Sequence, residues 1–117
     1  KLWSFDAQTG ILADPISPEF AAWLRPEGIA RDVSSLKRDA GRCATLARVT
    51  YADDPSRICW LLLIKPCVGM ELPADTRYHA TAYRSFPQDS TVDQFFDDAQ
   101  WEAYRVLGMR AGETVIG

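Results

Sequence analysis

The sequence predicts an α+β domain, in which a small antiparallel sheet is packed by three or four helices. An alternating segment, residues 43–52, and a strongly apolar segment, residues 57–65, flank a turn of Asp-Asp-Pro-Ser composition. This order predicts a central antiparallel hairpin. Four other segments space their apolar residues as helices do. Because a lone hairpin is only marginally stable in water, it needs a further strand or helices over its faces.

The hairpin strands differ in character. Residues 57–65 (RICWLLLIK) form the most apolar run of the chain, and their length and flanking turns favour a strand buried on both faces, although a buried helix also fits. Residues 1–5 (KLWSF) alternate well enough to supply a third strand. In the first hairpin strand, alternation separates two sets of side chains: Leu46, Arg48 and Thr50 on one face, and Ala47, Val49 and Tyr51 on the other.

Three helical segments precede the C-terminal one. Residues 17–25 begin with Ser-Pro-Glu, which is typical of a helix start, and proline follows Arg25. Residues 29–40 predict a second amphipathic helix, closed by Gly41. Residues 74–83 show weaker helical character.

The C-terminal helix has the strongest pattern. One continuous helical stripe is formed by Val92, Phe95, Phe96, Ala99, Ala103, Val106 and Leu107. Thr91 and Gln94 fit a capping box, which predicts a helix over residues 91–107 with Gly108 as its C-terminal cap. Asp97 is an equally suitable start after a one-turn first helix, so a continuous helix and one broken near Asp97 are both open. The tail after Gly108 shows little pattern.

Aromatic residues are concentrated in and just before this helix. We expect them to dock the helix into the core, over Leu61 or Leu63 of the hairpin, and a Phe96→Ala substitution to cost ~3–5 kcal/mol. The alternative is an aromatic surface that holds a partner or an apolar small molecule. The candidate residues of that surface are Phe86, Trp101, Tyr104 and Arg105.

Length and composition bound the class of protein. At 117 residues, with 47% hydrophobic and 25% charged residues, the chain fits one globular domain. The net charge is −3 and no basic cluster exceeds Lys37-Arg38, so we expect no nucleic-acid partner. No apolar run reaches the length of a transmembrane segment. The first residue is lysine, and we expect residues 1–117 to be a fragment or the C-terminal part of a larger protein.

Residues suited to catalysis or metal binding are few. The cysteines are Cys43, Cys59 and Cys67. They lack CxxC spacing and are typical of reduced thiols in a cytoplasmic protein. With His79, the single histidine, they match no usual zinc pattern, and we expect His79 at the surface or the core boundary. No GxSxG or glycine-rich phosphate loop occurs, and paired acids such as Asp97-Asp98 are explained by capping and solubility. We therefore expect no catalytic residue, metal site or cofactor.

Two segments carry a family resemblance. The first is Leu62-Leu63-Ile64-Lys65-Pro66. The second runs from Phe86-Pro87 through Ser90-Thr91 and Asp93-Gln94-Phe95-Phe96 to Gln100-Trp101, Tyr104-Arg105 and Gly108. In this order and spacing, they resemble the C-terminal region of bacterial patatin-like phospholipase-family proteins, where a strand ending in Ile-Lys-Pro precedes a Phe-Pro…Thr…Gln-Phe-Phe…Gln…Tyr-Arg…Gly segment.

The resemblance implies a role in lipid metabolism without catalysis. Family members use a Ser–Asp dyad, with the serine in GxSxG and the aspartate in Asp-Gly-Gly/Ala, and neither motif occurs in this chain. No catalytic residue is therefore carried over. The resemblance implies an accessory segment that packs on or gates a lipid-hydrolase domain of the same or another chain. The alternative is a stand-alone interaction or small-ligand-binding module, with self-association as one form of it.

Overall fold

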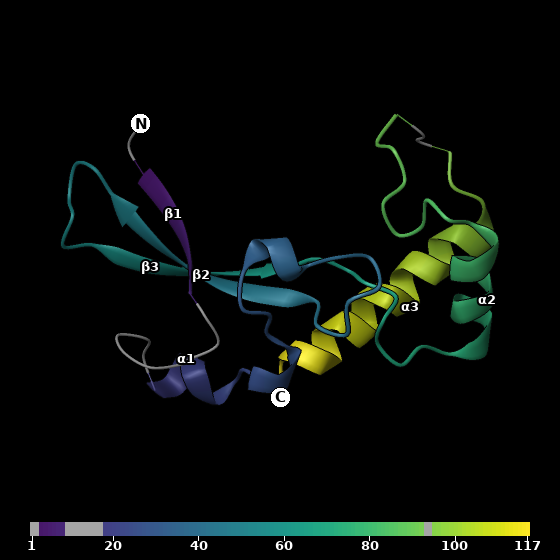
Figure 1. Cartoon of the computed structure of the whole chain (residues 1–117), viewed down its shortest axis with the longest axis horizontal. Coiled ribbons are helices and arrows are strands. Elements are labelled where there is room, and N and C mark those ends of the chain that lie inside the picture. Colours follow the sequence, from purple (N-terminus) through teal and green to yellow (C-terminus); the bar gives the residue numbers. More distant parts are fainter. Residues whose placement is uncertain (1–2, 9–17, 93–94) are drawn as a thin grey trace.

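The structure, a computed structural model, describes residues 3–8, 18–92 and 95–117. Its strands are β1 (Trp3–Gln8), β2 (Ala44–Tyr51) and β3 (Ile58–Ile64), and they form one antiparallel sheet in the order β1-β2-β3. The helices are α1 (Pro18–Ala22), α2 (Ala74–Ala82) and α3 (Asp98–Val115). Figure 1 shows the sheet at one end of the molecule and α2 at the other, with α3 running between them. The predicted α+β class and its central hairpin are confirmed.

Several predicted elements are present with shifted bounds. The third strand extends from Trp3 to Gln8, while Lys1 and Leu2 lie outside the described residues. The helix predicted over residues 17–25 is α1, which ends at Ala22; its expected cap, Ser17, also lies outside them. The weak helix predicted over residues 74–83 is α2.

The molecule is elongated. Its radius of gyration is 16.2 Å and its principal extents are 47, 30 and 21 Å, whereas a compact chain of this length has a radius of gyration of roughly 13 Å. The long axis is bridged by α3, whose two ends lie in different packing environments (Figure 1). As a result, the described residues form two small cores in place of one.

The first core lies between the sheet and the C-terminal half of α3. Its buried members are Leu24, Ile29, Cys43, Ala44, Leu46, Cys67, Ala111 and Val115. Trp60 and Leu62 of β3 pack against this cluster. Because side chains alternate between faces along a strand, Leu61 and Leu63 point to the other face. The expectation that the C-terminal helix packs over Leu61 or Leu63 was therefore wrong.

β3 is an edge strand, and the expectation that residues 57–65 are buried on both faces was wrong. None of its seven residues is fully buried. Leu61 is 45% exposed and lies opposite Ala47 of β2. The apolar run therefore leaves a hydrophobic strand at the boundary of the described fold.

The second core joins α2 to the N-terminal half of α3. Its buried members are Leu72, Ala80, Phe86, Ala103 and Leu107. Phe86 is the largest fully buried side chain, and a cis peptide bond links it to Pro87. This core fixes the position of residues 83–92, which form the loop between the two helices.

α3 begins directly after Asp97, the position at which the sequence allowed a break in the predicted helix. The Asp97 carboxylate accepts a hydrogen bond from the backbone N–H of Gln100 at 2.7 Å, as expected of an N-cap. Gln94, the partner in the alternative capping box, lies outside the described residues. The helix then continues to Val115, so the expected cap at Gly108 and the unpatterned tail were wrong.

The predicted helix over residues 29–40 was wrong. Ile29 forms a β-bridge with Ala44, and the backbone N–H of Ala30 donates to the Ala44 carbonyl at 2.6 Å. Short 3-10 turns occupy residues 26–28 and 33–35. Within the second turn, the carboxylate of Asp32 accepts hydrogen bonds from nearby serines, and such local bonds favour a turn over a helix.

Gly28 is required by the close approach of its turn to α3. A Cβ atom at this position would clash with the backbone carbonyl of Thr114. We expect Gly28→Ala to lower the free energy of unfolding by ~1–3 kcal/mol in urea denaturation, because the backbone must shift. Gly112→Ala is the matched control: nothing lies within 4 Å of its added Cβ, and alanine in a helix should add ~0.5–1 kcal/mol. Equal effects of the two substitutions would contradict the close approach.

Candidate functional site

The four residues of the predicted aromatic surface do not form one surface. Phe86 is fully buried in the second core, so its assignment to a surface was wrong. Trp101 is 67% exposed on α3. Arg105 is exposed and forms an ion pair with Glu102 at 2.6 Å. Tyr104 is partly buried and lies on the side of α3 that faces Phe86.

The expectation that aromatic side chains dock the helix into the core holds for only part of the set. Phe86 and Tyr104 contact each other, with ring centroids 4.8 Å apart. Phe96 stacks on Tyr104 at 5.3 Å but remains 37% exposed. Phe95 and Trp101 are largely exposed. Burial of the last two was therefore predicted wrongly.

A continuous series of ring contacts connects α2 with α3. The rings of Tyr83 and His79 are 4.6 Å apart, and His79 meets Phe86 edge-on at 5.0 Å. The series continues through Tyr104 to Phe96. His79 is only 9% exposed, so the expectation that it lies at the surface or the boundary was wrong. Its ring packs between Tyr83, which directly follows α2, and Phe86 in the next loop.

Asp89 is the polar centre of this end of the molecule. Its carboxylate accepts hydrogen bonds from the Tyr104 hydroxyl at 2.8 Å and the Gln100 side-chain amide at 3.2 Å. Burial favours the neutral acid, but hydrogen bonds from Ser85, Tyr104 and Gln100 and the nearby His79 outweigh this and lower the pKa of Asp89. Burial and the bond to Asp89 raise the pKa of Tyr104 to about 12. The carboxylate is therefore charged, and the phenol neutral, throughout the physiological range.

A cavity of about 190 Å³ adjoins this carboxylate. Its lining brings together a serine, a histidine and an aspartate, which are Ser85, His79 and Asp89. In nucleophilic catalysis the serine must pass its proton to an adjacent base, commonly histidine. Here the serine lies in the same lining as the carboxylate that, in a triad, would orient the histidine. The hydrogen bonds from Tyr104 and Gln100 to Asp89 fasten the loop to α3.

The pH dependence of the free energy of unfolding tests whether the Asp89 carboxylate holds the loop against α3. Since the pKa of Asp89 is lower in the folded chain, its stabilising contribution is complete above the unfolded pKa of about 3.9 and is lost as pH falls through the folded value. We expect the stability difference between wild type and Asp89→Asn, from urea midpoints, to be largest near neutral pH and to shrink below about pH 4. A difference that is constant from pH 3 to pH 7 would contradict the role of this carboxylate.

A larger and more apolar cavity, of about 330 Å³, lies between α2 and α3. Tyr78, His79 and Tyr83 line it from the α2 side, and Ala99 and Ala103 from α3. Trp101 and Arg105, which the sequence singled out, do not line it. Ala99 and Ala103 belong to the apolar stripe that the sequence predicts for the C-terminal helix, whereas the pattern of α2 is weak. No local sequence signal connects the residues of the two helices.

The cysteines lie in two separate places. Cys43 and Cys67 are buried in the first core, whereas Cys59 is exposed on β3. The hydrogen bond between the Cys43 and Cys67 thiols and their burial raise the pKa of Cys43. Within the described ranges, no group of three His, Cys, Asp or Glu residues is placed to hold a metal ion.

Among the residues that the structure describes, no helix combines the length and the apolar character needed to cross a bilayer.

Comparisons with protein-family models, curated proteins and solved structures find no match for this chain. The geometry of its own residues is therefore what bears on its function.

Proposed function

We propose that this chain is a non-catalytic segment that packs on a lipid-hydrolase domain of the same or another chain, as its resemblance to the C-terminal region of patatin-like acyl hydrolases implies. The observation that carries the proposal is the apolar edge strand β3, whose outer edge no strand of the described residues covers. Monomeric proteins rarely leave such a strand open, because it can pair with other chains.

The outer edge of β3 offers unpaired backbone groups. The backbone N–H of Lys65 donates to the Cys43 carbonyl at 2.7 Å, and hydrogen-bonded pairs alternate along an antiparallel ladder. The amides that point away from β2 are consequently those of Ile58, Trp60, Leu62 and Ile64. No strand in the described part of the chain pairs with this edge.

Side chains around that edge are also apolar. Ile58, Leu61 and Ile64 are all more than one-third exposed. A strand of the partner domain that added to β3 would satisfy the free amides and cover these side chains together. The partner would supply the catalytic groups, because the GxSxG and Asp-Gly-Gly/Ala motifs of the family do not occur in this chain. The three cysteines are free thiols, which is consistent with a location in the cytoplasm.

The proposal is tested first on the reading frame upstream of Lys1 and then on the protein itself. A GxSxG motif upstream supports a hydrolase domain in the same chain. We then expect Leu61→Glu to lower ester hydrolysis by the whole protein at least fivefold, while the isolated chain keeps its stability within ~0.5 kcal/mol. Met109→Glu, at an equally exposed position of α3, is the control and should leave hydrolysis unchanged. Ester hydrolysis by the isolated chain that survives replacement of every serine would contradict the proposal.

A second candidate function is the binding of a small apolar molecule. It is favoured by the 330 Å³ cavity between α2 and α3, whose lining is mostly apolar and includes Tyr78 and Tyr83. In that case a long-chain alcohol should change the tyrosine and tryptophan fluorescence of the isolated chain saturably. Ala99→Leu, which narrows the cavity, should weaken the response at least threefold; an unchanged response would exclude this site.

A further inference from the structure

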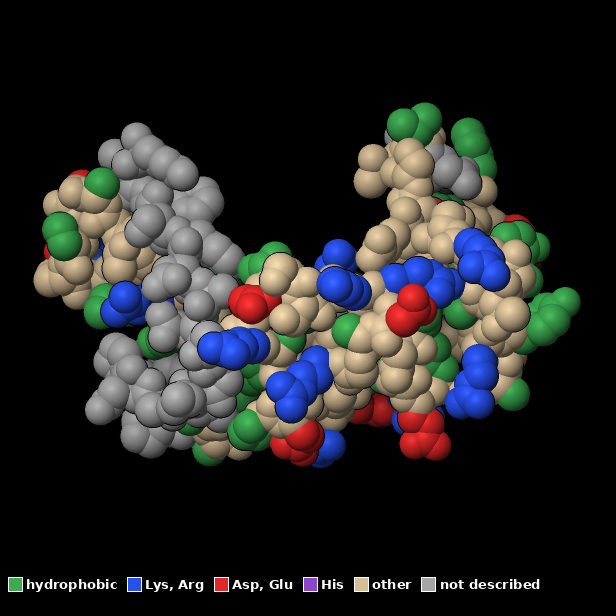
Figure 2. Space-filling model, viewed as in Figure 1, with side chains coloured by type: hydrophobic (Ala, Val, Ile, Leu, Met, Phe, Trp, Pro, Cys, Tyr) green, Lys and Arg blue, Asp and Glu red, His purple; other side chains and the backbone are tan. Residues whose placement is uncertain are grey.

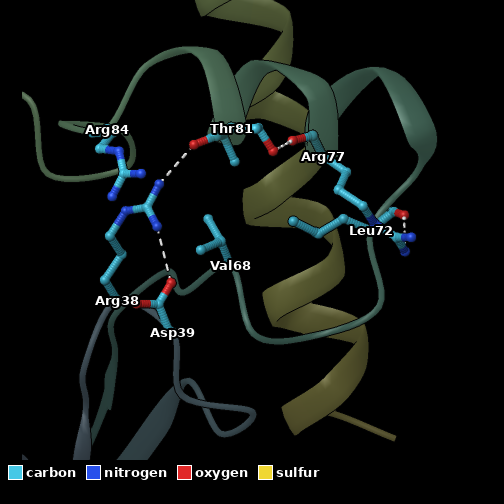
Figure 3. A pocket seen from close by; sticks show the side chains of 8 residues that line it. Arg38, Asp39, Val68, Leu72, Arg77, Thr81 and Arg84 are labelled. Carbon is cyan, nitrogen blue, oxygen red and sulfur yellow. Dashed lines mark hydrogen bonds and ion pairs between the residues drawn. The ribbon is translucent and has the colours of Figure 1, made fainter.

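A third cavity, of about 350 Å³, lies between α2 and the turn that precedes β2. Three arginines, Arg38, Arg77 and Arg84, line it with the carboxylate of Asp39. Figure 3 shows them around an apolar floor formed by Val68 and Leu72. The whole chain carries a net charge of −3, so a cleft in which guanidinium groups outnumber carboxylates is a local reversal of its charge.

Arg38 is held rigidly by hydrogen bonds that leave its charge in place. Its Nε donates to the Phe86 carbonyl at 2.8 Å, and one Nη donates to the Ala80 carbonyl at 2.7 Å. The other Nη pairs with Asp39 at 2.9 Å. Among the described residues, Asp39 is the one carboxylate paired with Arg38, and its side chain is largely exposed. A guanidinium fixed in this way is preorganised, because no rotamer freedom remains to be lost on binding.

Arg84 is the unengaged cation of the cleft. Within the described residues, no hydrogen bond or ion pair involves its side chain. Figure 3 shows its guanidinium and that of Arg38 directed into the same space. Two like charges that share a cleft repel each other, and an anion between them converts this repulsion into attraction on both sides.

Arg77 closes the opposite end. One of its Nη atoms donates to the Leu72 carbonyl at 3.1 Å, which holds the side chain along the cleft (Figure 3). Figure 2 shows basic side chains gathered across this face of the molecule, between the sheet and the helical end. The cleft is therefore open to solvent on a side from which an anionic ligand is attracted.

From this geometry we propose that the cleft lined by Arg38, Arg77 and Arg84 binds a singly esterified phosphate group. Guanidinium forks match the oxygen pairs of phosphate bidentately, and a dianion neutralises the excess positive charge. The cleft is larger than a free ion requires, and Val68 and Leu72 provide an apolar floor for the carbon side of the ester. The same phosphomonoester chemistry occurs in soluble metabolites and in lipid headgroups.

Binding is tested with inorganic phosphate and glycerol 3-phosphate as probes, by calorimetric titration at constant ionic strength set with chloride. We expect saturable binding by the wild type and at least tenfold weaker binding by Arg84→Gln, whose native side chain forms no hydrogen bond or ion pair with the residues that the structure describes. Arg31→Gln removes the same charge from an exposed position outside the cleft and should bind as the wild type does. Equal affinities of wild type and Arg84→Gln, or no saturable binding of either probe by the wild type, would overturn the proposal.

The source of the phosphate is distinguished with vesicles. Flotation with phosphatidic acid vesicles, but not with phosphatidylcholine vesicles, that is lost in Arg84→Gln indicates a lipid headgroup. Binding of glycerol 3-phosphate without flotation indicates a soluble ester, and both outcomes support the site. Flotation that Arg84→Gln and Arg31→Gln reduce equally reflects net charge alone and would count against it.

Discussion

Replacing Phe86 with alanine is expected to lower the free energy of unfolding by ~3–5 kcal/mol, a large share of the ~5–15 kcal/mol that stabilises a typical domain. The ring is fully buried and contacts His79 and Tyr104 at 5.0 and 4.8 Å. It occupies the centre of a core with only five buried members, so few neighbours can close the resulting cavity. Urea denaturation followed by circular dichroism measures the loss.

The control for this substitution is Phe96→Ala. Phe96 was the residue that the sequence marked for a ~3–5 kcal/mol effect, but it is 37% exposed. Its substitution should therefore cost only ~1–2 kcal/mol. If Phe86→Ala and Phe96→Ala lower the free energy of unfolding equally, the Phe86 ring is not the centre of the second core.

Arg38→Met is expected to cost ~2–4 kcal/mol. Methionine preserves much of the aliphatic volume but removes two hydrogen bonds, to the carbonyls of Ala80 and Phe86. Both bonds are partly buried, and an acceptor left without a partner costs ~1–3 kcal/mol. Because these bonds attach the segment before β2 to α2 and its following loop, amide hydrogen exchange should accelerate in α2 more than in β2.

Arg31→Met serves as the reference for Arg38→Met, since Arg31 is exposed and lines none of the three cavities discussed. Its effect should stay within ~0.5 kcal/mol. Combined with Phe86→Ala, Arg38→Met should cost less than the sum of the two, because both act on the same loop. Full additivity would show that Arg38 does not hold Phe86 in place.

Elements fixed by neighbouring residues could be predicted from the sequence. The hairpin follows from strand alternation and the turn after Tyr51. Asp97, which caps α3, was one of two helix starts that the sequence left open. The end of α3 was missed because Ala103, Leu107, Ala111 and Val115 continue a four-residue repeat, in which small alanines give a weak hydrophobic signal. The helix predicted over residues 29–40 failed because Ile29 pairs with Ala44, a contact that no local pattern reveals.

The candidate sites were less predictable than the fold. Asp89 meets residues from α2 and α3, and its partners Ser85 and Gln100 form no sequence motif with it. Arg38 and Arg84 meet only because the second core brings their segments together. The exposure of β3 was unforeseen for a different reason. Its apolar sequence does indicate burial, but the residues that the structure describes do not supply the covering surface.

Hydrogen exchange of the outer amides of β3 tests most directly whether this strand is a docking edge. In the isolated chain, the amides of Ile58, Trp60, Leu62 and Ile64 face away from β2 and should exchange rapidly. When the hydrolase domain is present, on the same or another polypeptide, we expect their exchange to slow at least tenfold, while the amides of the exposed turn residues Ala52, Asp53 and Asp54 change little. Unchanged exchange of these four amides in the presence of that domain would contradict the account.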